Sequence, residues 1–309
     1  MKQLGTLLLC IMFIACAQAD RTATNTAAAP ERDKRITELS KEKNLLTGFF
    51  KPMAVQDGDW LGSHPEDGET FEGYVESRPT LPTADRKTIY IQPIGKFSGE
   101  QHSVIRSTAD YMRAFYSLPV VLRDARPLGK VPDGMTRLQY PNNRQIQTNY
   151  FIDQLLPELL PRDAAALICF TSFDLYPGDT WNYVFGQASL EKRVGVWSLW
   201  RLEKDNGKPA GKDLFLDRTL KVAMHETGHM FSMRHCTKYE CLMSGTNHLG
   251  ETDRRPLDTC PECTMKIVWA MKYPAAERYK NLAEFWRKQG RADEQKQMLE
   301  KAQAVGEVK

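Results

Sequence analysis

Residues 225–236 read His-Glu-Thr-Gly-His-Met-Phe-Ser-Met-Arg-His-Cys, and this stretch predicts both the fold and the chemistry. His225 and His229 are four residues apart, so on a helix their rings project from one face and can bind one cation. Glu226 lies beside this pair, where its carboxylate would reach a metal-bound water. His235 follows six residues after His229, so the chain must leave the helix and turn back to supply a third ligand. Three neutral imidazoles would leave a fourth zinc position for water.

This ligand set indicates a hydrolase. Zinc lowers the pKa of its bound water from 15.7 towards about 7, which makes hydroxide available at neutral pH. Glu226 would accept the proton of that water and then deliver it to the leaving nitrogen. The stretch therefore predicts a zinc-dependent peptidase that acts on a peptide or protein substrate.

The residues before this stretch alternate between strand-like and helix-like patterns. The expected strands are 88–94, 118–122, 165–170, 182–185 and 194–199. The expected helices are 100–117, 148–160 and 214–224, the last with Asp217 as its candidate cap. This order predicts an α/β (α+β) fold over 87–271, a mostly parallel twisted sheet packed by helices.

The C-terminal end is polar and helical in pattern. Residues 275–289 and 292–304 predict two helices separated by Gly290. We therefore expect 272–309 to form a solvated helical tail behind the catalytic domain.

The N-terminus predicts export. Lys2 precedes an apolar stretch at 7–16, about the length of the apolar region of a signal peptide. Two processing sites follow, because Ala17-Gln18-Ala19 fits cleavage before residue 20 and Phe13-Ile14-Ala15-Cys16 resembles a bacterial lipobox. We expect a signal peptide over 1–19 and a periplasmic, secreted or lipoprotein location. A lipidated Cys16 would attach the protein to a membrane.

The remaining N-terminal residues, 20–86, read as a tether followed by an extension. Residues 20–40 are polar and Ala-rich without apolar periodicity, which predicts a flexible segment. Trp60, Phe71 and Tyr74 are apolar groups that would dock the later part on the core.

Composition narrows the class of partner. The chain has 309 residues, 41% of them hydrophobic and 26% charged, as in ordinary soluble proteins. The net charge of +3 is too small to indicate a nucleic-acid partner. Composition and charge do not determine the oligomeric state.

Four of the seven cysteines, Cys236, Cys241, Cys260 and Cys263, fall within 28 residues. Such a cluster indicates a metal site or disulfides, and composition alone does not choose between them. Cys169 lies in an apolar run, where a buried inert thiol is expected.

Together these motifs resemble the archaemetzincins, a metzincin family. The resemblance covers roughly 58–285. It is carried by the family motif HExxHxxGxxHC, matched at every position but 232, by Cys241-Leu242-Met243, by Cys260-Pro261-Glu262-Cys263, and by the stretches 174–177, 181–189, 195–196 and 253–257.

The resemblance implies a metzincin-like catalytic domain with zinc on His225, His229 and His235. It implies a second, structural zinc on the four clustered cysteines, in a C-terminal subdomain, and thus two zinc ions per chain. Cys-x-x-Cys with two further cysteines nearby is also a usual spacing for structural zinc. The resemblance also makes Met243 the Met-turn residue beneath the histidines, and it makes 185–189 the edge strand that holds a peptide.

The sequence departs from the family pattern at position 232, where Ser replaces Gly. A positive φ at this turn would cost Ser on the order of 1–2 kcal/mol. Two rivals stay open: a zinc-stabilised peptide-binding module without activity, and a zinc amidohydrolase acting on a non-peptide amide. Endopeptidase and aminopeptidase modes are not distinguished.

Four other positions carry side chains of the types found in metal and substrate sites. We expect His248 and Glu251 to be solvated loop residues rather than substrate ligands. His64 and His102 have no partner at ligand spacing and are expected to be surface histidines.

Overall fold

The computed structural model describes residues 14–139, 143–189 and 191–306, with side chains described from Pro30 onward. Lys2 and residues 7–13 of the leader lie outside the described residues, and so do the side chains of 14–19. The chain divides into two compact units, Met1–Glu42 and Lys43–Lys309. The expected divisions at 86/87 and 271/272 fall inside the second unit.

The helices, in chain order, are α1 Ile14–Leu45, α2 Trp60–Ser63, α3 Phe71–Glu76, α4 Gly99–Tyr116, α5 Leu156–Leu159, α6 Lys212–Met230, α7 Leu249–Arg254, α8 Pro261–Met271, α9 Ala275–Lys288 and α10 Ala292–Gly306. Two shorter turns are the 3-10 helix η1, Thr47–Phe49, and the π-helix η2, Tyr150–Leu155. The strands are β1 Thr88–Ile94, β2 Val120–Leu122, β3 Thr136–Gln139, β4 Asn143–Gln147, β5 Ala164–Thr171, β6 Asp174–Tyr176, β7 Gly186–Ala188, β8 Val194–Ser198, β9 Lys204–Asp205 and β10 Lys208–Pro209.

The segment 20–40, expected to be a flexible tether, is helical and lies within α1. Ala, Glu, Lys and Arg are strong helix formers, so a polar segment without an apolar stripe can still form a solvated helix. Among the described residues, none of the helices combines the length and apolar character needed to cross a bilayer.

A five-stranded sheet lies at the centre of the second unit, in the order β2-β1-β5-β8-β7. β1, β2, β5 and β8 run parallel, and β7 pairs antiparallel with β8 at the edge. All eight residues of β5 are buried, which is why its sequence is an apolar run without alternation. The expected mostly parallel sheet is confirmed.

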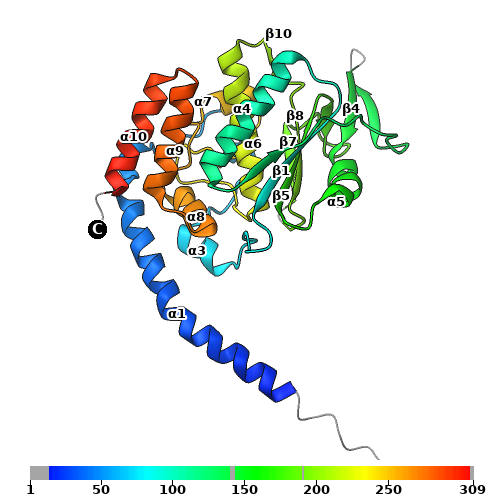
Figure 1. Ribbon diagram of the computed structural model, residues 1–309. Coiled ribbons are helices and arrows are strands. Elements are labelled where there is room, and N and C mark those ends of the chain that lie inside the picture. The colour runs from blue at the N-terminus through cyan, green and yellow to red at the C-terminus, as the bar shows by residue number, and fades with distance from the viewer. Residues whose placement is uncertain (1–13, 140–142, 190, 307–309) are drawn as a thin grey trace, which may run out of the picture. The chain divides into compact units, whose positions relative to one another are not determined.

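Helices cover both faces of this sheet, as Figure 1 shows. α4 and α6 pack together on one face, where the hydroxyl of Tyr116 donates to the carbonyl of Met224 over 2.6 Å. On the other face, η2 and α5 pack against β8, next to the small sheet β3-β4-β6. A capping box between Ser98 and Gln101 fixes the start of α4.

One expected strand lies elsewhere. Residues 182–185 form no strand, and only Val184 bridges to Leu175; the edge strand begins at Gly186. A Cβ on Gly186 would lie 2.9 Å from the Cβ of Trp197 in β8, so glycine permits the close pairing that starts there. The short strands β3, β4 and β6 were missed because they are polar and carry no clear apolar alternation.

The C-terminal tail is packed, which corrects the expectation of a solvated hairpin. Its helices α9 and α10 lie side by side (Figure 1), and α9 packs on α4. Phe285 and Trp286 contact Tyr111 with ring centroids 4.9 and 5.5 Å apart. Arg278 is 1% exposed and donates to Asp258 and to the carbonyl of Phe115. The tail therefore belongs to the core of the second unit.

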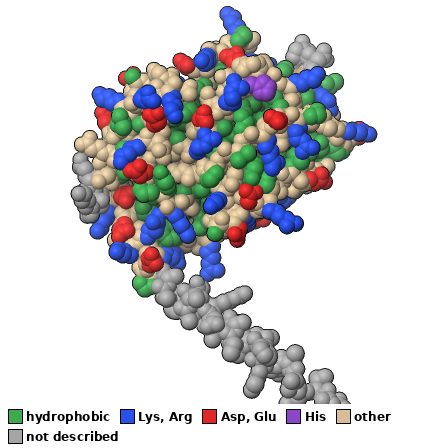
Figure 2. All heavy atoms as spheres, in the orientation of Figure 1, with side chains coloured by type: hydrophobic (Ala, Val, Ile, Leu, Met, Phe, Trp, Pro, Cys, Tyr) green, Lys and Arg blue, Asp and Glu red, His purple; other side chains and the backbone are tan. Residues whose placement is uncertain are grey.

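The extension after α1 is anchored as its aromatic residues predicted. Phe71 and Tyr74 are fully buried, and the Tyr74 hydroxyl donates to the carbonyl of Phe231 over 2.7 Å. On the face shown in Figure 2, basic and acidic side chains are interspersed, in keeping with the small net charge.

Candidate active site

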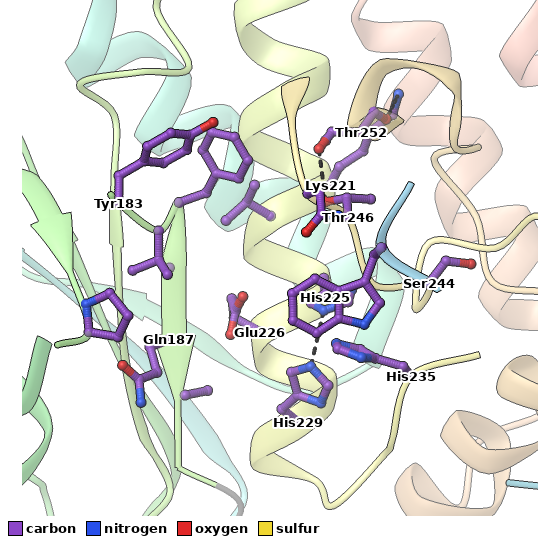
Figure 3. A pocket seen from close by; sticks show the side chains of 18 of the residues that line it. Tyr183, Gln187, Lys221, His225, Glu226, His229, His235, Ser244, Thr246 and Thr252 are labelled. Carbon is purple, nitrogen blue, oxygen red and sulfur yellow. Dashed lines mark hydrogen bonds between the residues drawn. The ribbon is translucent and has the colours of Figure 1, made fainter. Parts of the chain in front are cut away.

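Helix α6 places His225, Glu226 and His229 on the floor of a cleft. The helix begins after Gly211, so the expected cap Asp217 is wrong; that residue lies inside the helix and pairs with Arg291. The buried side chains of α6 anchor it against the sheet, so its histidine face is held in one orientation. Figure 3 shows the two histidines one above the other on α6, with Glu226 beside them.

The helix ends in a turn that reverses the chain. Ser232 has φ +63°, its N–H bonds the carbonyl of His229 over 2.8 Å, and the N–H of Met233 bonds that of Gly228 over 3.1 Å. This pair of bonds is a Schellman motif, which usually has glycine where Ser232 stands. The Ser232 hydroxyl accepts the N–H of Thr80 over 3.0 Å, a contact that offsets part of the strain. The turn therefore keeps its geometry without glycine.

The turn brings His235 back to the other two histidines. The ring centroids of the three lie 4.6 to 5.2 Å apart, and the Nε2 atoms of His225 and His229 are 3.0 Å apart. Two nitrogens on one tetrahedral zinc, each about 2.0 Å from it, would be separated by about 3.3 Å. The three residues thus form a group whose size suits one metal ion.

Each of these histidines is oriented through its Nδ1 atom. His225 contacts the carbonyl of Leu242 at 2.9 Å, and His229 contacts that of Met233 at 2.7 Å. A donated Nδ1–H leaves Nε2 free as a metal ligand, which is the usual arrangement around protein-bound zinc. Burial lowers the pKa of His225 well below its ordinary value and that of His229 to about 4. Both rings are therefore neutral, as zinc binding requires.

His235 is oriented by Glu66, a residue that the sequence analysis missed. The Glu66 carboxylate lies 2.8 Å from Nδ1 of His235, and it also accepts the indole N–H of Trp60. Burial raises the pKa of Glu66, but the hydrogen bonds from Trp60 and His235 outweigh it and hold the pKa below its usual range. Glu66 stands 169 positions away in the chain, and no spacing rule could connect it with the site.

Glu226 lies beside the histidines and its carboxylate is separate from the ligand group. It lines the cleft, and burial raises the pKa of its carboxyl to about 8. A Cβ on Gly186 would lie 3.1 Å from Cγ of Glu226, so the start of β7 passes directly over this side chain. Glu226 is thus placed between the histidine group and the sheet edge.

The cleft has a volume of about 750 Å³. The floor is α6, one wall is the segment 182–188, which includes β7, and the other wall includes Trp60 and the loop after Met243. Figure 3 shows Gln187 of β7 across the cleft from His229.

Beneath the histidines, Met243 packs against the zinc-motif helix. Met243 is 1% exposed, and a Cβ on Gly228 would lie only 2.6 Å from its sulfur. The glycine of the HETGH motif therefore makes room for this methionine, which agrees with the Met-turn position implied by the resemblance.

The four clustered cysteines form a second group of metal-ligand size. Cys236, Cys241, Cys260 and Cys263 are buried, free of disulfides, and have their sulfur atoms within 4.8 Å of one another. Hydrogen bonds from the other three thiols lower the pKa of Cys236, whereas burial raises that of Cys241. A buried four-sulfur set that favours a thiolate suits a structural zinc.

The structure corrects two expectations about nearby residues. Glu251 is fully buried rather than solvated and binds Arg255 over 2.8 Å, while His248 caps α7 by accepting the N–H of Glu251. His64 is half-buried and stacks on Trp60, which lines the cleft, with ring centroids 4.0 Å apart. His102 lies on α4 against Phe97, with no contact to the site among the described residues.

Comparisons with known proteins identify the family of the chain. Residues 159–268 match Peptidase family M54. Archaemetzincin-2 of Homo sapiens is 35% identical over 286 residues, and that of Macaca fascicularis is 34% identical over 281; each alignment covers 78% of this chain and 78% of the relative. The crystal structure of archaemetzincin from Methanopyrus kandleri aligns with a TM-score of 0.50 and 26% identity, over 62% of this chain and 98% of that one. The chain therefore belongs to the archaemetzincin family of zinc metallopeptidases.

Proposed function

We propose that this metallopeptidase hydrolyses peptide bonds in the cleft, with His225, His229 and His235 as the ligands of the catalytic zinc and Glu226 as the general acid and base. The observation that carries the proposal is the convergence of three rings, each oriented through Nδ1, beside a carboxylate that is not a ligand. When bound there, zinc would polarise the substrate carbonyl and lower the pKa of the attacking water.

Glu226 supplies the proton transfers. Burial alone raises the pKa of its carboxyl to about 8, and a neighbouring positive charge favours the carboxylate form. A group with a pKa near the working pH can take a proton from water and return it to the leaving nitrogen. Its position between the histidine group and β7 supports both transfers, from the attacking water and to the leaving nitrogen.

The edge strand β7 holds the substrate backbone. The carbonyl of Phe185 and the N–H of Ser189 form backbone hydrogen bonds with β8. Backbone groups alternate in direction along an antiparallel strand, so the N–H and C=O groups of Gly186 and Ala188 point to the open edge of the sheet. An extended peptide pairing there adds a strand to the sheet and lies across the histidine group.

The four cysteines hold a second, structural zinc, which gives two zinc ions per chain. Cys236 follows His235 directly, and its N–H bonds the carbonyl of Met243 over 2.8 Å. The second zinc would thus fix the turn that delivers the third catalytic ligand and the methionine beneath it. All four sulfurs are buried, which is consistent with a closed structural site.

Export remains part of the proposal, and it is supported by the leader at 1–19 alone. Oxidising compartments favour disulfides, so four zinc thiolates there require that zinc binds before oxidation. Fractionation of the native host would test the location.

The test of function is Glu226→Gln, with Glu191→Gln, an exposed carboxylate outside the cleft, as its control. The amide is nearly isosteric and the residue is not a ligand, so zinc content and the fold should be unchanged. Peptide hydrolysis should fall by about 100-fold or more, whereas the control should keep full turnover. Unchanged turnover in Glu226→Gln would contradict the assigned mechanism.

A further inference from the structure

One end of the cleft carries two cations that the proposed mechanism does not use. Lys221 stands four residues before His225 on α6, on the same face and about 6 Å along the axis. Arg255 follows α7, and both side chains line the cleft. Figure 3 shows Lys221 next to Thr246 and Thr252, above His225.

Lys221 has no carboxylate partner within 4 Å among the described residues. Its ammonium donates to two backbone carbonyls, Thr252 at 3.1 Å and Asp253 at 2.9 Å, which leaves one of its three donors for a ligand. Burial lowers the pKa of Lys221, and the charges of Asp217 and Asp253, which raise it, offset this only in part.

Arg255 also has an unused donor. The side chain is 4% exposed, and one guanidinium nitrogen binds Glu251 over 2.8 Å. Its Nε atom is buried and has no hydrogen-bond partner in the described part of the chain. A buried N–H without an acceptor costs free energy, and such groups are rare unless a ligand or water satisfies them.

The nearby acids are each paired with a cation other than Lys221. Asp253 accepts two hydrogen bonds from Arg218, at 2.8 and 2.6 Å, and Asp217 pairs with Arg291. Asp59 is paired with Arg254 and Glu251 with Arg255. Arg218 also contacts Asp205, Arg291 also contacts Glu294, and Arg255 also contacts Asp59, so these groups form ion-pair networks of their own. Lys221 takes part in none of these pairs, and its free donor is open to an anion in the cleft.

We infer that this end of the cleft binds a carboxylate of the peptide substrate, within one or two residues of the scissile bond. The carboxylate belongs to an Asp or Glu side chain or to the C-terminus of the peptide; Lys221 supplies the charge and Arg255 supplies the free donor. The 6 Å offset along α6 corresponds to about two residues of an extended chain. The inference names the substrate class of the proposed peptidase and rests on a peptide lying in this cleft.

Binding of peptides to the zinc-loaded full chain carrying Glu226→Gln tests the inference without turnover. The probes are alanine hexapeptide amides with one Glu, or its neutral isostere Gln, at each position in turn, and the same peptide with a free C-terminus. At one position, or at the free C-terminus, the carboxylate should tighten Kd by about 10- to 100-fold, the range for a hydrogen bond to a charged group. The peptide amides test a side-chain carboxylate, and the peptide with a free C-terminus tests a terminal carboxylate.

Adding Lys221→Met should remove this preference, and Lys221→Glu should reverse it in favour of a Lys-containing peptide. Lys212→Met, an exposed lysine on the same helix, should leave it intact. Equal binding of Glu and Gln peptides at every position and at both ends would overturn the inference, and so would a preference that survives in Lys221→Met. If the wild type binds with this preference yet cleaves none of the peptides, the hydrolytic function fails while the carboxylate site stands.

Discussion

The histidine group and the cysteine group adjoin in sequence, at His235 and Cys236, yet they differ in exposure. The three histidines are partly exposed and line the cleft, whereas the four cysteines are buried. Imidazoles that open on a cleft leave a metal position for water and substrate, and a closed thiolate set leaves none. Exposure therefore separates a catalytic site from a structural one.

The two groups also differ in what holds their ligands in place. Each histidine is positioned by a separate hydrogen-bond partner, two backbone carbonyls and the Glu66 carboxylate. The cysteine sulfurs contact one another, as in the 3.5 Å pair of Cys236 and Cys260. We expect the histidine group to persist without metal, and the cysteine group to depend on it.

The largest expected effect is that of Cys241→Ser. Cys241 is fully buried in the cysteine group. Binding of a structural zinc contributes about 10 kcal/mol or more to folding, and this contribution is lost with the metal. The variant should lose both metals and unfold, because the turn to His235 is no longer held. His229→Ala should lose the catalytic metal and activity yet remain folded. Metal analysis and circular dichroism on both variants compare their metal content and fold. If both variants lose the fold, or both keep it, the proposed difference between the two groups is contradicted.

A second prediction concerns pH in protein from which a chelator has removed the histidine-site metal while the zinc on the buried cysteines is retained. Burial raises the folded pKa of Glu226 from 4.5 to about 8. A carboxyl whose pKa is raised by folding contributes stability when the pH is below its pKa in the unfolded chain. That contribution is lost as the pH rises through its pKa in the folded protein. Stability should therefore fall between pH 5 and 8, relative to Glu226→Gln, by about 2–4 kcal/mol after allowing for partial exposure. Urea titrations across this range measure it, and parallel curves would disprove the shift.

Gly228→Ala should destabilise the protein by about 1–3 kcal/mol. The new Cβ would lie 2.6 Å from the Met243 sulfur, so the methionine beneath the histidines must shift. Gly99→Ala, at a helical glycine with open space around it, is the matched control and should be neutral or mildly stabilising. Thermal denaturation compares them. A neutral Gly228→Ala would show that the Met243 contact is not tight.

The smallest expected effect is that of Ser232→Gly. Glycine relieves the positive φ, worth about 1 kcal/mol, but removes the bond to Thr80, worth about as much. The net change should lie within about 1 kcal/mol, with both metals retained. Ser232→Ala keeps the strain and loses the bond, so it should be the less stable of the two. The reverse order in urea unfolding would show that the positive φ at this position carries no strain. A Ser232→Ala variant as stable as the wild type would show that the bond to Thr80 contributes nothing.

Much of the fold could be predicted because its signals are local. The buried run of β5 and the apolar spacing of α4 each reflect the period of one element, and both lie within a residue or two of their expected bounds. The tail was misjudged because its apolar face, with Phe285 and Trp286, looks the same in sequence whether or not a partner covers it. Only the packing on α4 shows that it is covered.

The sequence by itself determined the two candidate ligand sets, because four-residue spacing on a helix and the adjacency of His235 and Cys236 are properties of neighbouring residues. Tertiary structure alone decided that Glu66 orients His235, that Gly186 of β7 passes over Glu226, and that Lys221 faces the cleft beside Arg255 without a counter-ion. These relations join segments far apart in the chain. No local periodicity encodes them, because they depend on how the layers pack.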